Sequence, residues 1–111
     1  MKSDRIRLRH MLDAAKEAMD FATAHSRPEL DTNRMLTLAL VKSIEIVGEA
    51  ASKLGPELRA QYPDIPWQDI VGMRNRLIHA YFDVDLDRVW DTVTDDLPPL
   101  AAALDAILKN E

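Results

Sequence analysis

The sequence predicts an all-α fold, an antiparallel bundle of four to five helices that forms a single domain over residues 1–111. Three observations favour this class. Apolar residues recur at helical spacing over long runs, only three residues are glycine, and few β-branched residues lie outside those runs. A chain of 111 residues is long enough to bury one core and too short for two.

The first two helices are predicted over residues 4–25 and about 31–54. Arg27–Pro28 ends the first one, because the residue before a proline disfavours the α conformation. Gly55–Pro56 is a strong stop for the second. Across all helices, the residues predicted to form the core are Leu12, Met19, Leu40, Ile44, Val47, Ile70, Leu77, Trp90, Val93 and Leu104.

Two further helices follow a short helical turn at residues 56–61. Pro66 is well placed to begin the third helix, where its missing N–H costs nothing, and this helix is expected to continue through residues 73–81. Asp85 is a plausible N-cap for the last helix. The apolar stripe of that helix keeps its phase across Pro98–Pro99, so we expect a kink at this point rather than a new domain.

Composition restricts the possible functions. The net charge of −5 argues against broad, non-specific nucleic-acid affinity, and Arg5, Arg7 and Arg9 are spread around a helix instead of forming one patch. No cysteine, metal-binding motif or glycine-rich phosphate loop is present, so neither metal nor cofactor is expected. No apolar run approaches the roughly 20 residues of a membrane span, and no leader opens the chain, so a cytoplasmic protein with no membrane association is expected.

The segment 73–81 contains the residues best suited to chemistry. As a helix it places Arg74 near the middle of an apolar stripe, where a cation costs several kcal/mol unless it is paired. Glu45 and Glu49, four residues apart on the second helix, are the candidate partners. Asn75 and His79 lie together on the flank of the same predicted helix.

A histidine that transfers protons and an arginine that stabilises charge on phosphorus are the groups that RNA phosphodiester cleavage requires. Any RNA would have to be met at Arg5, Arg7 and Arg9 or at Arg74 and Arg76, with Arg76 supporting Arg74. On one helix Arg74 and His79 point about 140° apart, a separation that a two-fold dimer with facing motifs would relieve. From the residues alone, a buried Arg74 paired with Glu45 or Glu49, beside a polar His79, explains the pattern slightly better than a catalytic site does.

The central region resembles the HepT group of HEPN ribonuclease toxins. The resemblance rests on Ile-Val-Gly-Glu-Ala-Ala at 46–51, Ile-Pro-Trp at 65–67, residues 73–85 and Val-Trp at 89–90, and extends from about residue 5 to residue 108. Within 73–85 an arginine is followed directly by a polar residue, and His-x-Tyr begins after four intervening positions in all, the polar residue included. Position 80 is alanine where the family commonly has glycine, which favours a helix that persists to Tyr81.

The resemblance implies a homodimeric, metal-independent endoribonuclease in which Arg74 and His79 are catalytic and Asn75 supports them. It implies the toxin of a type VII toxin–antitoxin pair, with transfer RNA as the expected substrate. The partner would be a minimal nucleotidyltransferase antitoxin that adenylylates Tyr81, adding bulk and negative charge beside the site. Two alternatives remain open: a non-catalytic helical module that docks a nucleotidyltransferase, and a nucleotide-binding partner that leaves RNA intact.

Overall fold

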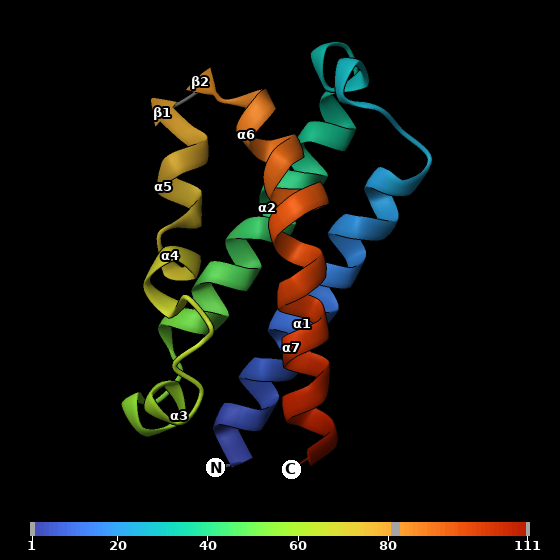
Figure 1. Cartoon of the computed structure of the whole chain (residues 1–111). Coiled ribbons are helices and arrows are strands. Elements are labelled where there is room, and N and C mark those ends of the chain that lie inside the picture. Colours follow the sequence, from blue (N-terminus) through green and yellow to red (C-terminus); the bar gives the residue numbers. More distant parts are fainter. Residues whose placement is uncertain (1, 81–82, 111) are drawn as a thin grey trace.

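The computed structural model describes residues 2–80 and 83–110 and confirms the all-α prediction. Three long helices, α1 (Lys2–Thr23), α2 (Arg34–Ser52) and α7 (Leu97–Asn110), pack together (Figure 1). The two ends of the chain lie at the same end of the bundle. Within the described ranges, no helix combines the length and the apolarity that a membrane span requires.

The core lies between these three helices. Small side chains on α1, among them Ala15 and Ala18, are fully buried and let the helices approach closely. Most of the predicted core positions are buried, while Met19 and Trp90 are partly buried and pack against the core. Near the start of α1 the buried carboxylate of Asp4 accepts the backbone N–H of Gly55 at 3.2 Å, which ties α1 to the turn after α2.

The connection between α1 and α2 differs slightly from the prediction. A 3-10 helix, η1 (Arg27–Asp31), precedes α2, which begins at Arg34 instead of near residue 31. The side chain of Asn33 accepts the N–H of Leu36 at 3.0 Å, and this cap fixes the start of α2. Arg27 pairs with Asp31 at 3.1 Å and, across the fold, with Asp87 at 2.6 Å, so it links η1 to α6.

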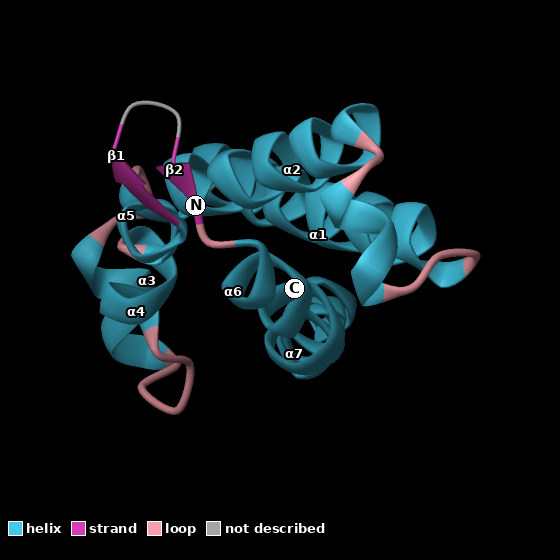
Figure 2. Ribbon diagram, turned by 90° about the horizontal axis from the view of Figure 1, so that it is seen from above, coloured by secondary structure: helices cyan, strands magenta, loops and turns pink. Residues whose placement is uncertain are grey.

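The predicted continuous helix up to Tyr81 is wrong. After α3 (Pro56–Gln61) the chain forms two short helices packed against α2, α4 (Trp67–Val71) and α5 (Met73–Leu77), separated by Gly72. Strand β1 (Ile78–Ala80) then pairs antiparallel with β2 (Asp83–Val84), as Figure 2 shows beside α5. Tyr81 lies outside the described residues.

Backbone hydrogen bonding explains why the helix stops. The carbonyl of Leu77, which a continuing helix would offer to the fourth residue beyond it, accepts the N–H of Asp85 at 2.6 Å instead. Ile78 has an extended backbone (φ −119°, ψ 108°) and is paired with Val84, and β-branched residues such as these two favour strands. A contact with a segment several residues further on therefore overrides the local helical pattern.

The last part of the chain is helical from α6 (Leu86–Asp91) through η2 (Thr92–Asp96) to α7. The carboxylate of Asp85 caps α6 by accepting the N–H of Arg88 at 3.0 Å, as predicted. A kink was predicted at Pro98–Pro99. The helix departs from α geometry one turn earlier, where η2 is a π-helix. A proline ring crowds the carbonyl four residues before it, and the wider π turn provides that room.

Candidate functional site

Arg74 lies on α5 with its side chain 53% exposed, so the prediction of an arginine surrounded by apolar side chains is wrong. The prediction assumed one helix through Ile70 and Leu77, both of which are buried. Because Gly72 divides that helix, α4 and α5 do not form one continuous apolar face. Arg74 is therefore accessible to a ligand in solution.

Glu45 on α2 is the partner of Arg74 in this structure. The arginine Nε donates to the Glu45 Oε2 at 2.5 Å, and the glutamate side chain is 30% exposed. Glu49, the other candidate, pairs instead with Lys53 at 3.5 Å. An exposed ion pair adds about 0–1 kcal/mol to stability, so the main effect of the Glu45 contact is to orient the guanidinium.

A groove of about 710 Å³ opens beside this ion pair, along the seam between α1 and α2. It takes its walls from residues at helical spacing on the two long helices, and from Arg74 on α5. The lining residues are Ser3, Ile6, Arg7, His10, Lys42, Glu45, Ile46, Glu49, Ala50, Lys53 and Arg74.

The charge of this groove is opposite to that of the whole chain. Four permanent cations line it against two carboxylates, a balance of 4 − 2 = +2 with His10 taken as neutral. The chain as a whole carries −5. Among the three N-terminal arginines only Arg7 lines the groove, in agreement with the predicted spread of Arg5, Arg7 and Arg9 around the helix. The groove is thus a local cationic site on an acidic protein, suited to an anionic ligand.

The other motif residues lie around the end of α5. Asn75 is exposed on α5, and the backbone of His79 belongs to β1. The chain leaves the helix between Arg74 and His79, so the separation of about 140° calculated for a continuous helix does not describe these two residues. The predicted modification site, Tyr81, falls outside the described part of the chain.

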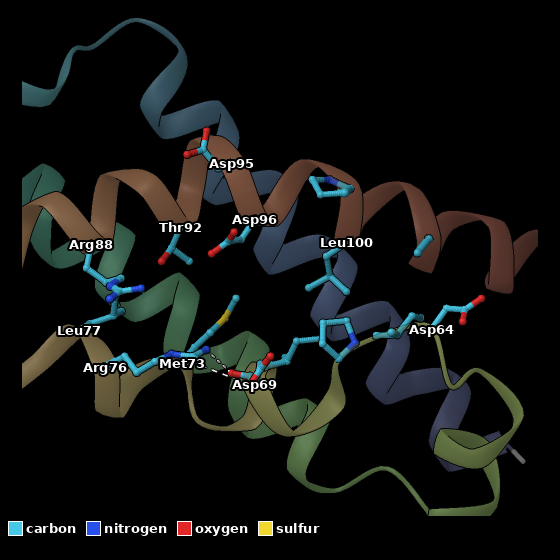
Figure 3. Close-up of a pocket in the computed structure, with 15 residues that line it drawn as sticks. Asp64, Asp69, Met73, Arg76, Leu77, Arg88, Thr92, Asp95, Asp96 and Leu100 are labelled. Carbon is cyan, nitrogen blue, oxygen red and sulfur yellow. Dashed lines mark hydrogen bonds and ion pairs between the residues drawn. The ribbon is translucent and has the colours of Figure 1, made fainter.

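Arg76, predicted to support Arg74, lines a different cavity of about 430 Å³ between α4–α5 and the α6–α7 helix. Its guanidinium donates to the carbonyl of Asp69 at 2.6 Å and pairs with the carboxylate of that residue at 3.5 Å. Figure 3 shows Arg88 and Asp96 on the opposite wall. With two arginines and four aspartates, this cavity has a balance of 2 − 4 = −2, which is unfavourable for RNA.

No group of three or more candidate metal ligands occurs in the part of the chain that the structure describes. Arg74 lines the cationic groove, and β1, whose backbone includes His79, follows α5 directly in the chain.

Comparisons with known proteins agree on one family. The family profile described as "Ribonuclease HepT-like" matches residues 11–107. A "Putative RNase" of Caldanaerobacter subterraneus subsp. tengcongensis is 35% identical over 111 residues, which cover 100% of this chain and 99% of that protein. A "Probable ribonuclease HepT" of Thermococcus cleftensis is 38% identical over 71 residues, 64% of each chain. No solved structure matches the chain significantly.

Proposed function

The chain belongs to the HepT-like ribonuclease family, and from this premise we propose that it is a metal-independent endoribonuclease with Arg74 and His79 as its catalytic residues. Asn75 supports them. The observation that carries the proposal is the placement of Arg74, whose exposed guanidinium lines a groove of positive charge on an acidic chain.

Cleavage would proceed by attack of the ribose 2′-oxygen on the adjacent phosphorus, while the bond from phosphorus to the 5′-oxygen breaks. A free imidazole has a pKa of about 6.5, which suits His79 to take the 2′ proton or to give a proton to the leaving 5′-oxygen. Arg74 remains protonated and would stabilise the charge that develops on the phosphorus oxygens. The products are a 2′,3′-cyclic phosphate and a 5′-hydroxyl.

The motif resemblance supports the biological setting of this reaction. The protein would be the toxin of a type VII pair, acting on RNA, with transfer RNA as the expected class. A homodimer with facing motifs would form the full cleft. A minimal nucleotidyltransferase would act as antitoxin by adenylylating Tyr81, which places a bulky anion beside Arg74 and His79 and repels RNA.

The test is RNA cleavage by the purified protein in the presence of EDTA. Wild type is expected to cleave a transfer RNA pool, and Arg74→Ala and His79→Ala are each expected to slow cleavage by about 10²–10⁴-fold, because each removes charge stabilisation or proton transfer. Arg34→Ala is the matched control, since Arg34 is exposed at the far end of α2 and outside the groove. Intact RNA with wild-type protein whose Tyr81 is unmodified by mass spectrometry would refute the proposal.

The second candidate function is a non-catalytic module that docks a nucleotidyltransferase. The ion pair between Arg74 and Glu45 favours it, because the arginine already has a structural partner. Expression of the chain without its partner separates the two: a toxin arrests growth and loses that effect with His79→Ala, whereas a docking module is harmless in both forms.

A further inference from the structure

We propose that Arg7 and Lys42 form a phosphate-binding subsite that holds single-stranded RNA along the α1–α2 seam and leads it to Arg74. The inference rests on the proposed ribonuclease function and deepens it, because it assigns substrate-positioning residues outside the motif. All three side chains line the same groove, although they come from three different helices.

Arg7 is the first observation that points to an anion. It is half-buried, and its guanidinium has no ion pair or hydrogen bond within residues 2–80 and 83–110. By contrast, Arg27, Arg74 and Arg76 each contact a carboxylate. A partly desolvated cation without a partner is costly, and a phosphate oxygen would relieve that cost.

Lys42 is the second observation. It is exposed on α2, three residues before Glu45, so it lies one turn away from the partner of Arg74. Lys53, at the other end of the same stripe, is engaged with Glu49, whereas Lys42 has no carboxylate partner in the described part of the chain. The positive balance of the groove therefore resides on the two unpaired cations, Arg7 and Lys42.

Two exposed isoleucines favour a single strand over a duplex. Ile6 and Ile46 are 51% and 37% exposed, and both line the same groove as the cations. A single strand presents unstacked bases that can cover such apolar surface, while a duplex presents mainly phosphates and riboses. A groove that combines cations with exposed apolar side chains suits a strand that presents both phosphates and bases.

The experiment measures binding separately from cleavage. A fluorescent RNA oligonucleotide with 2′-O-methyl riboses lacks the attacking hydroxyl and stays intact, so fluorescence anisotropy across a salt series reports affinity alone. Arg7→Gln and Lys42→Gln are each expected to weaken binding several-fold and to reduce the slope of log K against log salt by about 0.7. Arg7→Lys is expected to recover most of the affinity.

Arg5→Gln is the matched control, because it makes the same change on the same helix at an exposed position outside the groove. Its affinity and salt slope should equal those of wild type. Thermal unfolding of each variant verifies that the bundle is intact. Equal binding by Arg7→Gln, Lys42→Gln and Arg5→Gln would overturn the subsite. Competition by an unlabelled duplex as effective as that by a single strand would overturn the assignment to single strands.

Cleavage of the unmodified strand, measured in parallel, keeps the two proposals apart. If wild type cleaves RNA but Arg7→Gln and Arg5→Gln bind alike, the subsite is wrong and the ribonuclease stands. If RNA binds with the expected dependence on Arg7 and Lys42 yet is never cleaved, the subsite is supported and the catalytic proposal fails.

Discussion

At Gly48 the backbone of α2 lies close to the C-terminal end of α4. A Cβ added there would lie 3.1 Å from the carbonyl oxygen of Ile70 and 3.5 Å from that of Val71, so the missing side chain is what allows α4 to approach. Both obstacles are backbone atoms at the end of a helix, which cannot rotate away as a side chain would. Gly48 thereby sets the position of α4 and, through it, of α5 with Arg74.

Gly48→Ala is expected to destabilise the protein by up to about 2 kcal/mol. Alanine gains about 1 kcal/mol of helix propensity, but the crowding of a close contact costs about 1–3 kcal/mol. Urea denaturation measures the difference. Gly72→Ala is the control, because its added Cβ would meet no atom closer than 3.4 Å, and it should be neutral or stabilising. Equal effects of the two substitutions would contradict the close approach at Gly48.

Arg74 illustrates which features of the site can be predicted from the sequence and which cannot. The sequence shows the residue types of the motif and the spacing from Arg74 to His79, and it indicates Glu45 as a candidate partner. The exposure of Arg74 cannot be read from the sequence, because it depends on a helix break at Gly72, and a single glycine is not a strong signal for such a break. Arg7 could not be singled out from Arg5 and Arg9 in the sequence, because only the packing of α1 on α2 distinguishes it from them.

At the scale of elements, helix ends were predictable where the chain carries its own signals. Asp85 caps α6 with its side chain, and Pro56 begins α3, as local chemistry requires. The β1–β2 pair was not predictable from periodicity, since Ile70, Leu77 and Ile78 fit a helical stripe equally well. Its existence depends on the later residues Asp83–Val84 and on the Asp85 N–H that captures the Leu77 carbonyl.

On α7, the hydrogen bond from Lys109 lowers the pKa of Asp105 below 3.8, with smaller electrostatic contributions from Lys109, Lys16 and Arg9. A carboxyl whose pKa is lower in the folded state stabilises the fold above the unfolded pKa and loses this effect as pH falls through the folded value. Asp105→Asn should therefore be slightly less stable than wild type at pH 7, and the gap should close at an acidic pH below the folded pKa of Asp105. Denaturant midpoints at both pH values test this, and a gap that widens in acid would contradict it.

At the scale of the whole molecule, one core joins the long helices. Leu104 on α7 is fully buried in the core cluster that also contains α1 and α2 side chains, so Leu104→Ala is expected to cost about 2–5 kcal/mol. Leu38→Ala is the control, because Leu38 is 51% exposed and its removal should change stability by about 0.5 kcal/mol or less. Chemical denaturation measures both, and a Leu104→Ala effect as small as that of the control would contradict the packing of α7.

Glu45 affects which molecules can bind Arg74, because it places a carboxylate inside the cationic groove. A phosphate that binds Arg74 has to displace this carboxylate, which cannot diffuse away. A lone nucleotide would bind through few contacts, whereas a polymer would contact several cations of the groove at once and gain avidity. On the proposed ribonuclease function, the ion pair is expected to favour RNA chains over free nucleotides by a few-fold, because an exposed ion pair is worth about 0–1 kcal/mol.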